Sequence, residues 1–407
     1  MSDPLPALSP ILDRFKPSAI SEIFSLAAKL KAEGRKIYDL STGEPDFPTP
    51  RHIRDAAAEA MAAGDTKYSP TDGTFAMKAA VSRKFQRDNG LTYTDDEIVI
   101  ASGAKPLLAD AIRTIAAPGC EVVLPAPCWP SHIGMIEIAG ASPRFVRTSM
   151  ETGFKMTPAA LAAAMTLATR AVLLCSPSNP AGATYSAAEL AQLAEVLARH
   201  PDVWVVSDDL YEHILFDGRS FSTIAQIAPA LRSRTLTVNG VSKAYAMTGW
   251  RIGYAAGPQP LIGALRKVMS QTTGCPCSIG QAAAIAALDG PQDFLSTWID
   301  VYQRRRDRSA ATLNKTNALR CTMPEGAFYL YPWCGGLLGK LTRRGMTIGS
   351  SADFVRYLLE DWSVAVVPGA AFEVDPHFRI SFATADADLD EGIRRIGAAV
   401  EALSYRG

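Results

Sequence analysis

A lysine and an arginine lie close together in residues 242–253, directly after an apolar stretch that predicts a strand. Lys243 could bond covalently to an aldehyde, and Arg251 could hold an anion on the same molecule. Pyridoxal phosphate (PLP) is an aldehyde that binds a lysine as a Schiff base and also carries a phosphate. The pair therefore indicates PLP chemistry, although taken alone each residue is more commonly a solvated surface charge.

Small or polar residues follow three other apolar stretches that predict strands. They are Ser102, Gly103 and Ala104 after residues 98–101, Asn179 after residues 171–175, and Asp208 after residues 203–207. In open α/β sheets, ligands bind at the carboxyl ends of the strands. We therefore expect these residues to share one site with the lysine.

Two of these strand ends suggest specific contacts with PLP. Backbone N–H groups in the turn at residues 102–105 could bind a phosphate at a helix N-terminus, although a plain strand-to-helix turn explains the turn about as well. The Asp208 carboxylate could pair with the protonated ring nitrogen and keep the ring an electron sink. The alternative for Asp208 is a helix N-cap.

Three further side chains could complete a cofactor site. Tyr211 and Asn179 could each hydrogen-bond the phenolic oxygen of the ring, and Trp129 could stack on the ring. The alternatives are ordinary core positions for the two aromatic residues and, for Asn179, a turn without a role in binding.

An arginine inside an apolar run is a candidate for substrate binding. Arg379 lies in residues 378–382. A buried arginine needs an anionic partner, and its planar guanidinium matches a carboxylate. If this strand lies at a sheet edge, Arg379 is instead a surface charge.

Two further candidates, Tyr68 and Gly43, lie in loops, and no local pattern distinguishes them from ordinary loop residues.

The elements that must position these residues alternate between short apolar runs and helical stretches from about residue 50 to 290. This alternation predicts an α/β fold with a mostly parallel sheet covered by helices. The expected strands are residues 98–101, 121–124, 144–147, 171–175, 203–207, 235–239 and 252–256. One of the expected helices spans residues 187–199.

The pattern changes after about residue 290. We expect a long charged helix over residues 293–319, further helices over 352–360 and 387–403, and strands near 327–331, 364–367 and 378–382. These elements predict a smaller α+β domain. We expect a large domain of residues 48–292 and a small domain formed by residues 1–47 and 293–407.

The bulk composition narrows the functional classes. The chain has 407 residues, with 41 basic and 41 acidic side chains. A net charge of zero provides no electrostatic reason to expect nucleic acid or an anionic membrane as partner, and no apolar run is long enough to span a bilayer. The seven scattered cysteines include only one close pair, so we expect no metal site and reduced thiols, as in the cytoplasm.

Together these segments resemble the fold-type I, class I/II PLP-dependent aminotransferases, and especially their bacterial aspartate/aromatic branch. The resemblance covers about residues 16–403. The shared motifs are Thr42-Gly43-Glu44-Pro45-Asp46-Phe47, Lys67-Tyr68, Asn179-Pro180, Asp208 with Tyr211-Glu212-His213, and the lysine segment as far as Gly253.

The resemblance implies a role for each candidate residue. Lys243 would form the Schiff base, Asp208 would pair with the ring nitrogen, and Asn179 and Tyr211 would bond the phenolic oxygen. The remaining cofactor contacts would be Trp129 over the ring, Ser102, Gly103, Ala104 and Arg251 at the phosphate, Ser242 beside the lysine, and Tyr68 from the other subunit of a homodimer. Arg379, Asn179 and the Gly43 backbone would bind the substrate α-carboxylate.

The implied reaction moves an amino group between an L-amino acid and a 2-oxo acid. Side-chain specificity is left open, because dicarboxylate-preferring members often have a lysine and a hydroxyl residue where this chain has Ala104 and Ile20. Lys105 is one position after the place where those members have their lysine, and we expect its side chain to point away from the site. The partner-subunit segment 271–276 also departs from the usual pattern.

Other functions that use PLP remain as alternatives to an aminotransferase. A PLP-dependent β-lyase of the carbon–sulfur type and a cyclopropane-forming synthase both use this fold. A PLP-sensing regulator would need an added DNA-binding domain, and no basic helix-turn-helix segment is visible. Release of pyruvate and ammonia from cysteine or cystathionine would favour the lyase.

Overall fold

The computed structural model describes residues 8–14 and 19–405, with the side chains of residues 19–22 and 24 left out. Its largest element is a seven-stranded sheet in the order β2-β8-β7-β6-β5-β3-β4. The strands are β2 (Ile98–Ala101), β3 (Glu121–Ala126), β4 (Ser142–Arg147), β5 (Thr169–Cys175), β6 (Trp204–Asp208), β7 (Thr235–Gly240) and β8 (Gly253–Ala256). Only β8 runs antiparallel to its neighbours, so the predicted mostly parallel mixed sheet is confirmed.

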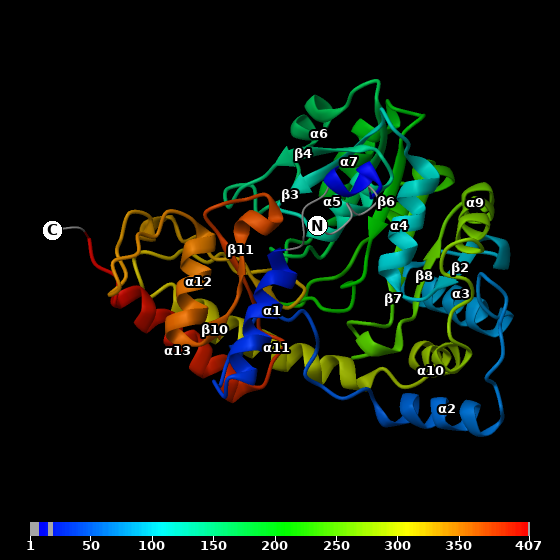
Figure 1. Cartoon of the computed structure of the whole chain (residues 1–407). Helices are drawn as coiled ribbons and strands as arrows, with labels where there is room; N and C mark the ends of the chain where they lie inside the picture. Colours follow the sequence, from blue (N-terminus) through cyan, green and yellow to red (C-terminus); the bar gives the residue numbers. More distant parts are fainter. Residues whose placement is uncertain (1–7, 15–18, 406–407) are drawn as a thin grey trace, which may run out of the picture.

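Both faces of this sheet are buried, which explains why its central strands are apolar without alternation. Leu173 of β5 packs into the core on one face, whereas Val172 and Leu174 pack into the core on the other. Helices that cover the sheet and flank it appear in Figure 1. They are α2 (Arg51–Ala62), α3 (Phe75–Asn89), α4 (Ala104–Ile115), α5 (Pro130–Ile138), α6 (Pro158–Ala164), α7 (Ala187–Ala198), α8 (Ile224–Ile227), α9 (Gln259–Met269) and α10 (Ser278–Asp289).

A second group of elements surrounds two small sheets. A three-stranded antiparallel sheet has the order β11-β12-β9, and β1 pairs with β10 in parallel. The strands are β1 (Tyr38–Asp39), β9 (Tyr329–Leu330), β10 (Val364–Ala365), β11 (Val367–Pro368) and β12 (Phe378–Ser381). The helices are α1 (Ala19–Ala32), α11 (Asp293–Leu313), α12 (Ser351–Trp362) and α13 (Asp386–Glu401), and α11 extends from the side of α10 to the side of α13 (Figure 1).

Two predicted elements in this part were wrong in detail. The long helix ends at Leu313 rather than at residue 319, because the Asn314 side chain folds back and bonds both the N–H and the carbonyl of Cys321. The single strand expected over residues 364–367 is two strands, since β10 pairs with β1 whereas β11 pairs with β12.

Three features of the described residues bear on the other sequence expectations. No helix among them is long and apolar enough to cross a membrane. All seven cysteines are free thiols. Ile20 lies in α1, but its side chain is outside the described part, so its expected effect on specificity has no structural account.

Candidate active site

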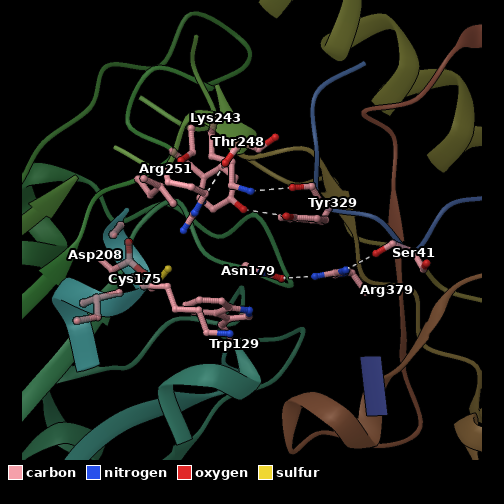
Figure 2. Close-up of a pocket in the computed structure, with 17 residues that line it drawn as sticks. Ser41, Trp129, Cys175, Asn179, Asp208, Lys243, Thr248, Arg251, Tyr329 and Arg379 are labelled. Carbon is pink, nitrogen blue, oxygen red and sulfur yellow. Dashed lines mark hydrogen bonds between the residues drawn. The ribbon is translucent and has the colours of Figure 1, made fainter. Parts of the chain in front are cut away.

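A cavity of about 280 Å³ lies where the carboxyl ends of β5, β6 and β7 face β9 and β12 (Figure 2). Predicted site residues from both groups of elements line it. They are Gly43, Ala104, Trp129, Asn179, Asp208, Tyr211, Ser242, Lys243, Arg251 and Arg379. The structure therefore brings together residues that are up to 336 positions apart in the chain. Asn179, Asp208 and Lys243 follow strand ends at one edge of the large sheet, as expected, whereas Arg379 comes from the small sheet.

Lys243 lies on the turn after β7 and is partly buried. Its Nζ donates a hydrogen bond of 2.7 Å to the Gly43 carbonyl. Burial, together with the nearby Arg379 guanidinium, lowers the pKa of Lys243 to about 8. A lysine with this pKa has a substantial neutral fraction near physiological pH, and the neutral amine is the form that attacks an aldehyde.

Asp208 is the last residue of β6, where its carboxylate is buried. Its Oδ2 lies 3.0 Å from Nε2 of His132 on α5, whereas its Oδ1 is buried and has no partner among the described residues. Because a buried carboxylate oxygen without a donor is costly, the site is suited to a ligand that supplies an N–H group. Sequence reasoning missed His132, which no local pattern distinguishes from other helical residues.

Arg251 lies against the turn that precedes α4. A Cβ atom built on Gly103 would come within 2.3 Å of an Arg251 guanidinium nitrogen, and Gly103 has a φ of +105°. The positive φ favours glycine at this position, and the absence of a Cβ leaves room for the Arg251 guanidinium. The guanidinium and the unpaired N–H groups of the first turn of α4 together form an anion site.

Arg379 lies on the central strand of the three-stranded sheet, so the alternative of a surface charge on an edge strand is excluded. Its guanidinium donates to Asn179 Oδ1 at 2.9 Å and to the Ser41 carbonyl at 2.6 Å. The Nε atom is buried without a partner. A carboxylate entering the cavity can therefore satisfy a charge that the protein itself leaves unneutralised.

Two tyrosines meet at the floor of the cavity. The hydroxyl oxygens of Tyr211 and Tyr329 are 2.8 Å apart, and the Arg379 guanidinium lies 4.5 Å from the centre of the Tyr329 ring. A Cβ atom on Gly43 would lie 2.3 Å from the Tyr329 hydroxyl, so Gly43 makes room for this side chain. Sequence reasoning also missed Tyr329, because β9 is too short to show that its register places Tyr329 beside β12.

Lys105 lines the cavity, so the expectation that it points elsewhere was wrong. Its Nζ lies 5.4 Å from the centre of the Trp129 ring. The reason is helical geometry: α4 begins at Ala104, whose side chain packs into the core, and the next residue is rotated toward the cavity. Burial and the charge of Arg251 lower the pKa of Lys105.

Three predicted site residues do not line the cavity. Ser102 and Gly103 lie directly behind it in the turn before α4. Tyr68 is 98 % exposed and lies near the altered segment, since neighbouring Ser69 donates to the Pro276 carbonyl at 3.4 Å. Within one chain, Tyr68 therefore does not reach the cofactor position.

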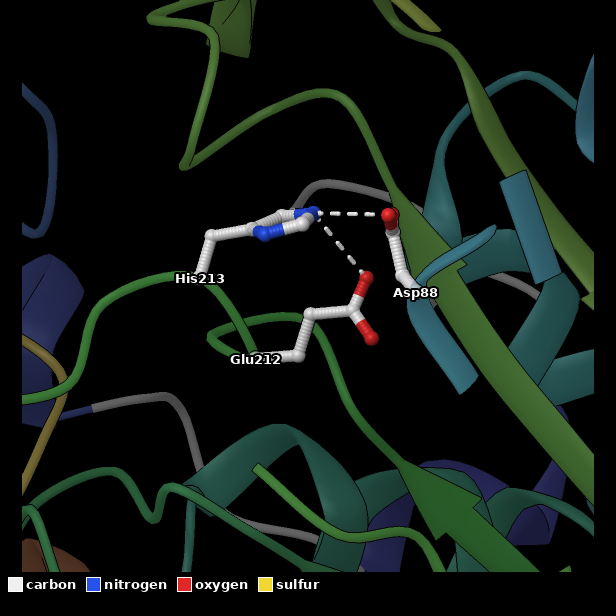
Figure 3. A group of neighbouring side chains, drawn as sticks. All are labelled: Asp88, Glu212 and His213. Atoms are coloured by element: carbon white, nitrogen blue, oxygen red, sulfur yellow. Dashed lines mark ion pairs between the residues drawn. The ribbon is translucent and has the colours of Figure 1, made fainter. Parts of the chain in front are cut away.

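A group of possible metal ligands lies elsewhere. Single atoms of Asp88, Glu212 and His213 all lie within 4.8 Å of one another (Figure 3). The buried Lys84 ammonium forms an ion pair with Glu212 and lies 3.9 Å from Asp88 Oδ2. Because this cation already occupies the acidic cluster, we assign no metal to it.

The cavity fits PLP on the chemistry of its donors and acceptors. Lys243 supplies the amine for the aldehyde, the unpaired Asp208 Oδ1 suits the ring nitrogen, and Arg251 suits the phosphate. The described residues thus meet each functional group of the cofactor with a complementary partner.

Comparisons with known proteins agree with this site. Residues 35–396 match the family model described as aminotransferase class I and II. An aspartate aminotransferase of Rhizobium meliloti is 52 % identical over 387 residues, covering 95 % of this chain and 94 % of the relative. An aspartate/prephenate aminotransferase of Cereibacter sphaeroides is 51 % identical over 397 residues, covering 98 % and 99 %. A crystal structure of the aspartate aminotransferase from Rhizobium meliloti superposes with a TM-score of 0.95 at 51 % identity, covering 98 % and 100 %.

The fold and the cavity define a PLP-dependent enzyme of fold type I. The chain belongs to the aminotransferase class I and II family. Relatives with about half of their residues identical over nearly the whole chain are named as aminotransferases, so the β-lyase alternative is not favoured.

Proposed function

We propose that this aminotransferase prefers dicarboxylic substrates and uses aspartate as amino donor. The observation that supports this proposal is Lys105, which lines the cavity in addition to Arg379, Arg251 and Lys243. Arg379 would bind the α-carboxylate, and Lys105 would bind the side-chain carboxylate. The names of the relatives from Rhizobium meliloti and Cereibacter sphaeroides agree with this substrate class.

Each cavity residue has a proposed task. Asp208 holds the ring nitrogen protonated, Tyr211 and Asn179 hydrogen-bond the phenolic oxygen, and Trp129 covers the ring. Bound PLP supplies an electron sink for the bond that breaks at the substrate Cα. Arg251 binds the phosphate, assisted by Ser242 and by the turn formed by Ser102, Gly103 and Ala104.

Lys243 would move the proton. With PLP and substrate bound, its Nζ would take the proton from the substrate Cα as a general base and would later return a proton as a general acid. A pKa of about 8 suits both steps near neutral pH. Arg379, Asn179 and the Gly43 backbone fix the α-carboxylate and so orient the bond to the proton, which contributes to lowering the barrier.

A homodimer with shared active sites completes this proposal. Tyr68 is almost fully exposed, and Met61 and Phe75, seven positions before and after it in the chain, are 57 % and 73 % exposed. Exposed large apolar side chains in one segment are consistent with a protein interface, and Tyr68 would bind the cofactor phosphate of the partner subunit. Sedimentation equilibrium should give twice the chain mass; a monomeric mass in the PLP-loaded, active protein would contradict this arrangement.

The absorbance spectrum of the purified protein tests the function. Aspartate added without any 2-oxo acid should convert the PLP band to the pyridoxamine phosphate band, and Lys243→Ala should abolish turnover. Conversion by alanine or aromatic amino acids but not by aspartate would contradict the dicarboxylate preference. Prephenate should be tested as acceptor, since one relative is named for it.

Two further sequence predictions are kept as proposals. The division into a large domain of residues 48–292 and a small domain of residues 1–47 and 293–407 is retained as a proposal, supported by the start of α11 at Asp293. A cytoplasmic location also remains a prediction.

A further inference from the structure

The Tyr211–Tyr329 contact joins the two groups of elements at the cavity. Tyr211 follows β6 of the large sheet, whereas Tyr329 lies on β9 of the three-stranded sheet. Ser381 of β12 is the register partner of Tyr329, so this tyrosine and Arg379 belong to the same small sheet. The 2.8 Å hydroxyl contact is therefore a direct polar link between the part that would hold the cofactor and the part that would hold the substrate carboxylate.

The number of protons in this contact decides its direction once PLP is present. A tyrosine hydroxyl has one proton to donate and can also accept. If Tyr211 donates its proton to the phenolic oxygen of PLP, it can only accept from Tyr329. Burial raises the pKa of both hydroxyls, and the Arg379 guanidinium partly offsets this rise at Tyr329, so both remain protonated near neutral pH.

We propose that Tyr329 is a positioning residue whose hydroxyl donates to Tyr211 and thereby directs the Tyr211 proton toward the phenolic oxygen of bound PLP. The inference rests on the proposed role of Tyr211. A chain of two hydrogen bonds polarises both members, which strengthens the bond from Tyr211 to the cofactor.

The packing around Tyr329 keeps its hydroxyl in this direction. The side chain is fully buried. The centre of its ring lies 4.5 Å from the Arg379 guanidinium and 5.8 Å from the centre of the Tyr211 ring. Gly43 leaves the space that the hydroxyl needs. The charged groups that face the pair are Arg379 and Lys243, whose Nζ lies 5.9 Å from the Tyr211 ring centre.

The test is a pH titration of the absorbance of PLP-loaded protein without substrate. Donors to the phenolic oxygen favour the deprotonated form of the chromophore, so loss of the Tyr329 hydroxyl in Tyr329→Phe should raise the midpoint by about half a pH unit. Tyr211→Phe should raise it further. In the Tyr211→Phe background, Tyr329→Phe should cause no additional shift, because its effect passes through Tyr211.

A matched control separates this effect from a general loss of packing. Tyr331 is buried two residues along the chain, and its hydroxyl donates to the Val374 carbonyl at 2.9 Å, outside the cavity. Tyr331→Phe should lose a hydrogen bond yet leave the titration midpoint unchanged. Tyr329→Phe keeps the ring beside Arg379, so we expect kcat to fall several-fold while KM for aspartate stays within about twofold.

Two results would overturn the proposal. One is a Tyr329→Phe titration that matches the unchanged protein, and the other is an equal shift with and without Tyr211. Either result would leave the aminotransferase assignment intact, provided that the unchanged protein loads PLP and turns over. By contrast, if the unchanged protein never develops the PLP band, the cofactor assignment is contradicted and the role of Tyr329 is not the cause.

Discussion

His132 Nε2 and Asp208 Oδ2 form a buried contact of 3.0 Å that joins α5 to the end of β6. The contact uses one carboxylate oxygen of this cavity-lining residue and leaves Oδ1 without a partner among the described residues. His132 therefore fixes the rotation of the carboxylate, and the free oxygen marks where a ring N–H group would lie.

Asp208→Asn should lower kcat by about a hundredfold or more, because it removes a fixed charge from the position where the ring nitrogen must stay protonated. A steady-state assay with aspartate and a 2-oxo acid measures this change. Asp209→Asn is the matched control, since this neighbouring carboxyl bonds Ser207 and does not line the cavity. Equal losses in both variants would contradict the role of Asp208.

Asp209 should make stability depend on pH. Burial raises the pKa of this carboxyl to about 7, above its ordinary value of 3.8, so the folded protein holds a proton that the unfolded chain releases. Its contribution to stability is therefore present below about pH 4 and is lost as the pH rises to about 7. The melting temperature of Asp209→Asn relative to the unchanged protein should rise across this window and then level off. A difference that does not vary with pH would argue against a protonated Asp209.

Lys243 should set the rate at which apo-protein captures PLP. With a pKa of about 8, its neutral fraction rises about tenfold between pH 7 and pH 9 and then approaches a plateau. Stopped-flow absorbance at several pH values measures the rate under excess protein. A rate that keeps climbing steeply between pH 9 and pH 10 would indicate an ordinary, unshifted lysine.

Lys105→Met should lower kcat/KM for aspartate roughly ten- to hundredfold, the range expected for loss of one charge-assisted hydrogen bond to a carboxylate. Alanine has no side-chain carboxylate, so its kcat/KM serves as the internal control and should change little. Equal losses for both amino acids would instead place Lys105 at the cofactor phosphate, beside Arg251.

Local pattern was sufficient for the elements of the large sheet. The apolar runs that end at Cys175 and near Asp208 are buried on both faces. Their apolar composition without alternation predicts this burial from the sequence alone. Residue type at strand ends likewise predicted that Lys243, Asn179 and Asp208 lie together, because the carboxyl ends of parallel strands meet at one edge of a sheet. The C-terminal end of α11 depends on the contact of the Asn314 side chain with Cys321, and the splitting of β10 from β11 depends on β1, which is distant in the chain.

The sequence by itself determined the fold class, through its periodicity, and the resemblance of its motifs to class I/II aminotransferases indicated the cofactor chemistry and most of the residues in the cavity. Only the tertiary structure decided that Lys105 enters the cavity, that His132 holds Asp208, and that Tyr329 meets Tyr211. The physical reason is that each of these contacts depends on the rotation of a helix or the register of a short strand against a distant partner. A pattern of residues along one short segment shows which face is buried, but it does not identify the distant residue that this face meets.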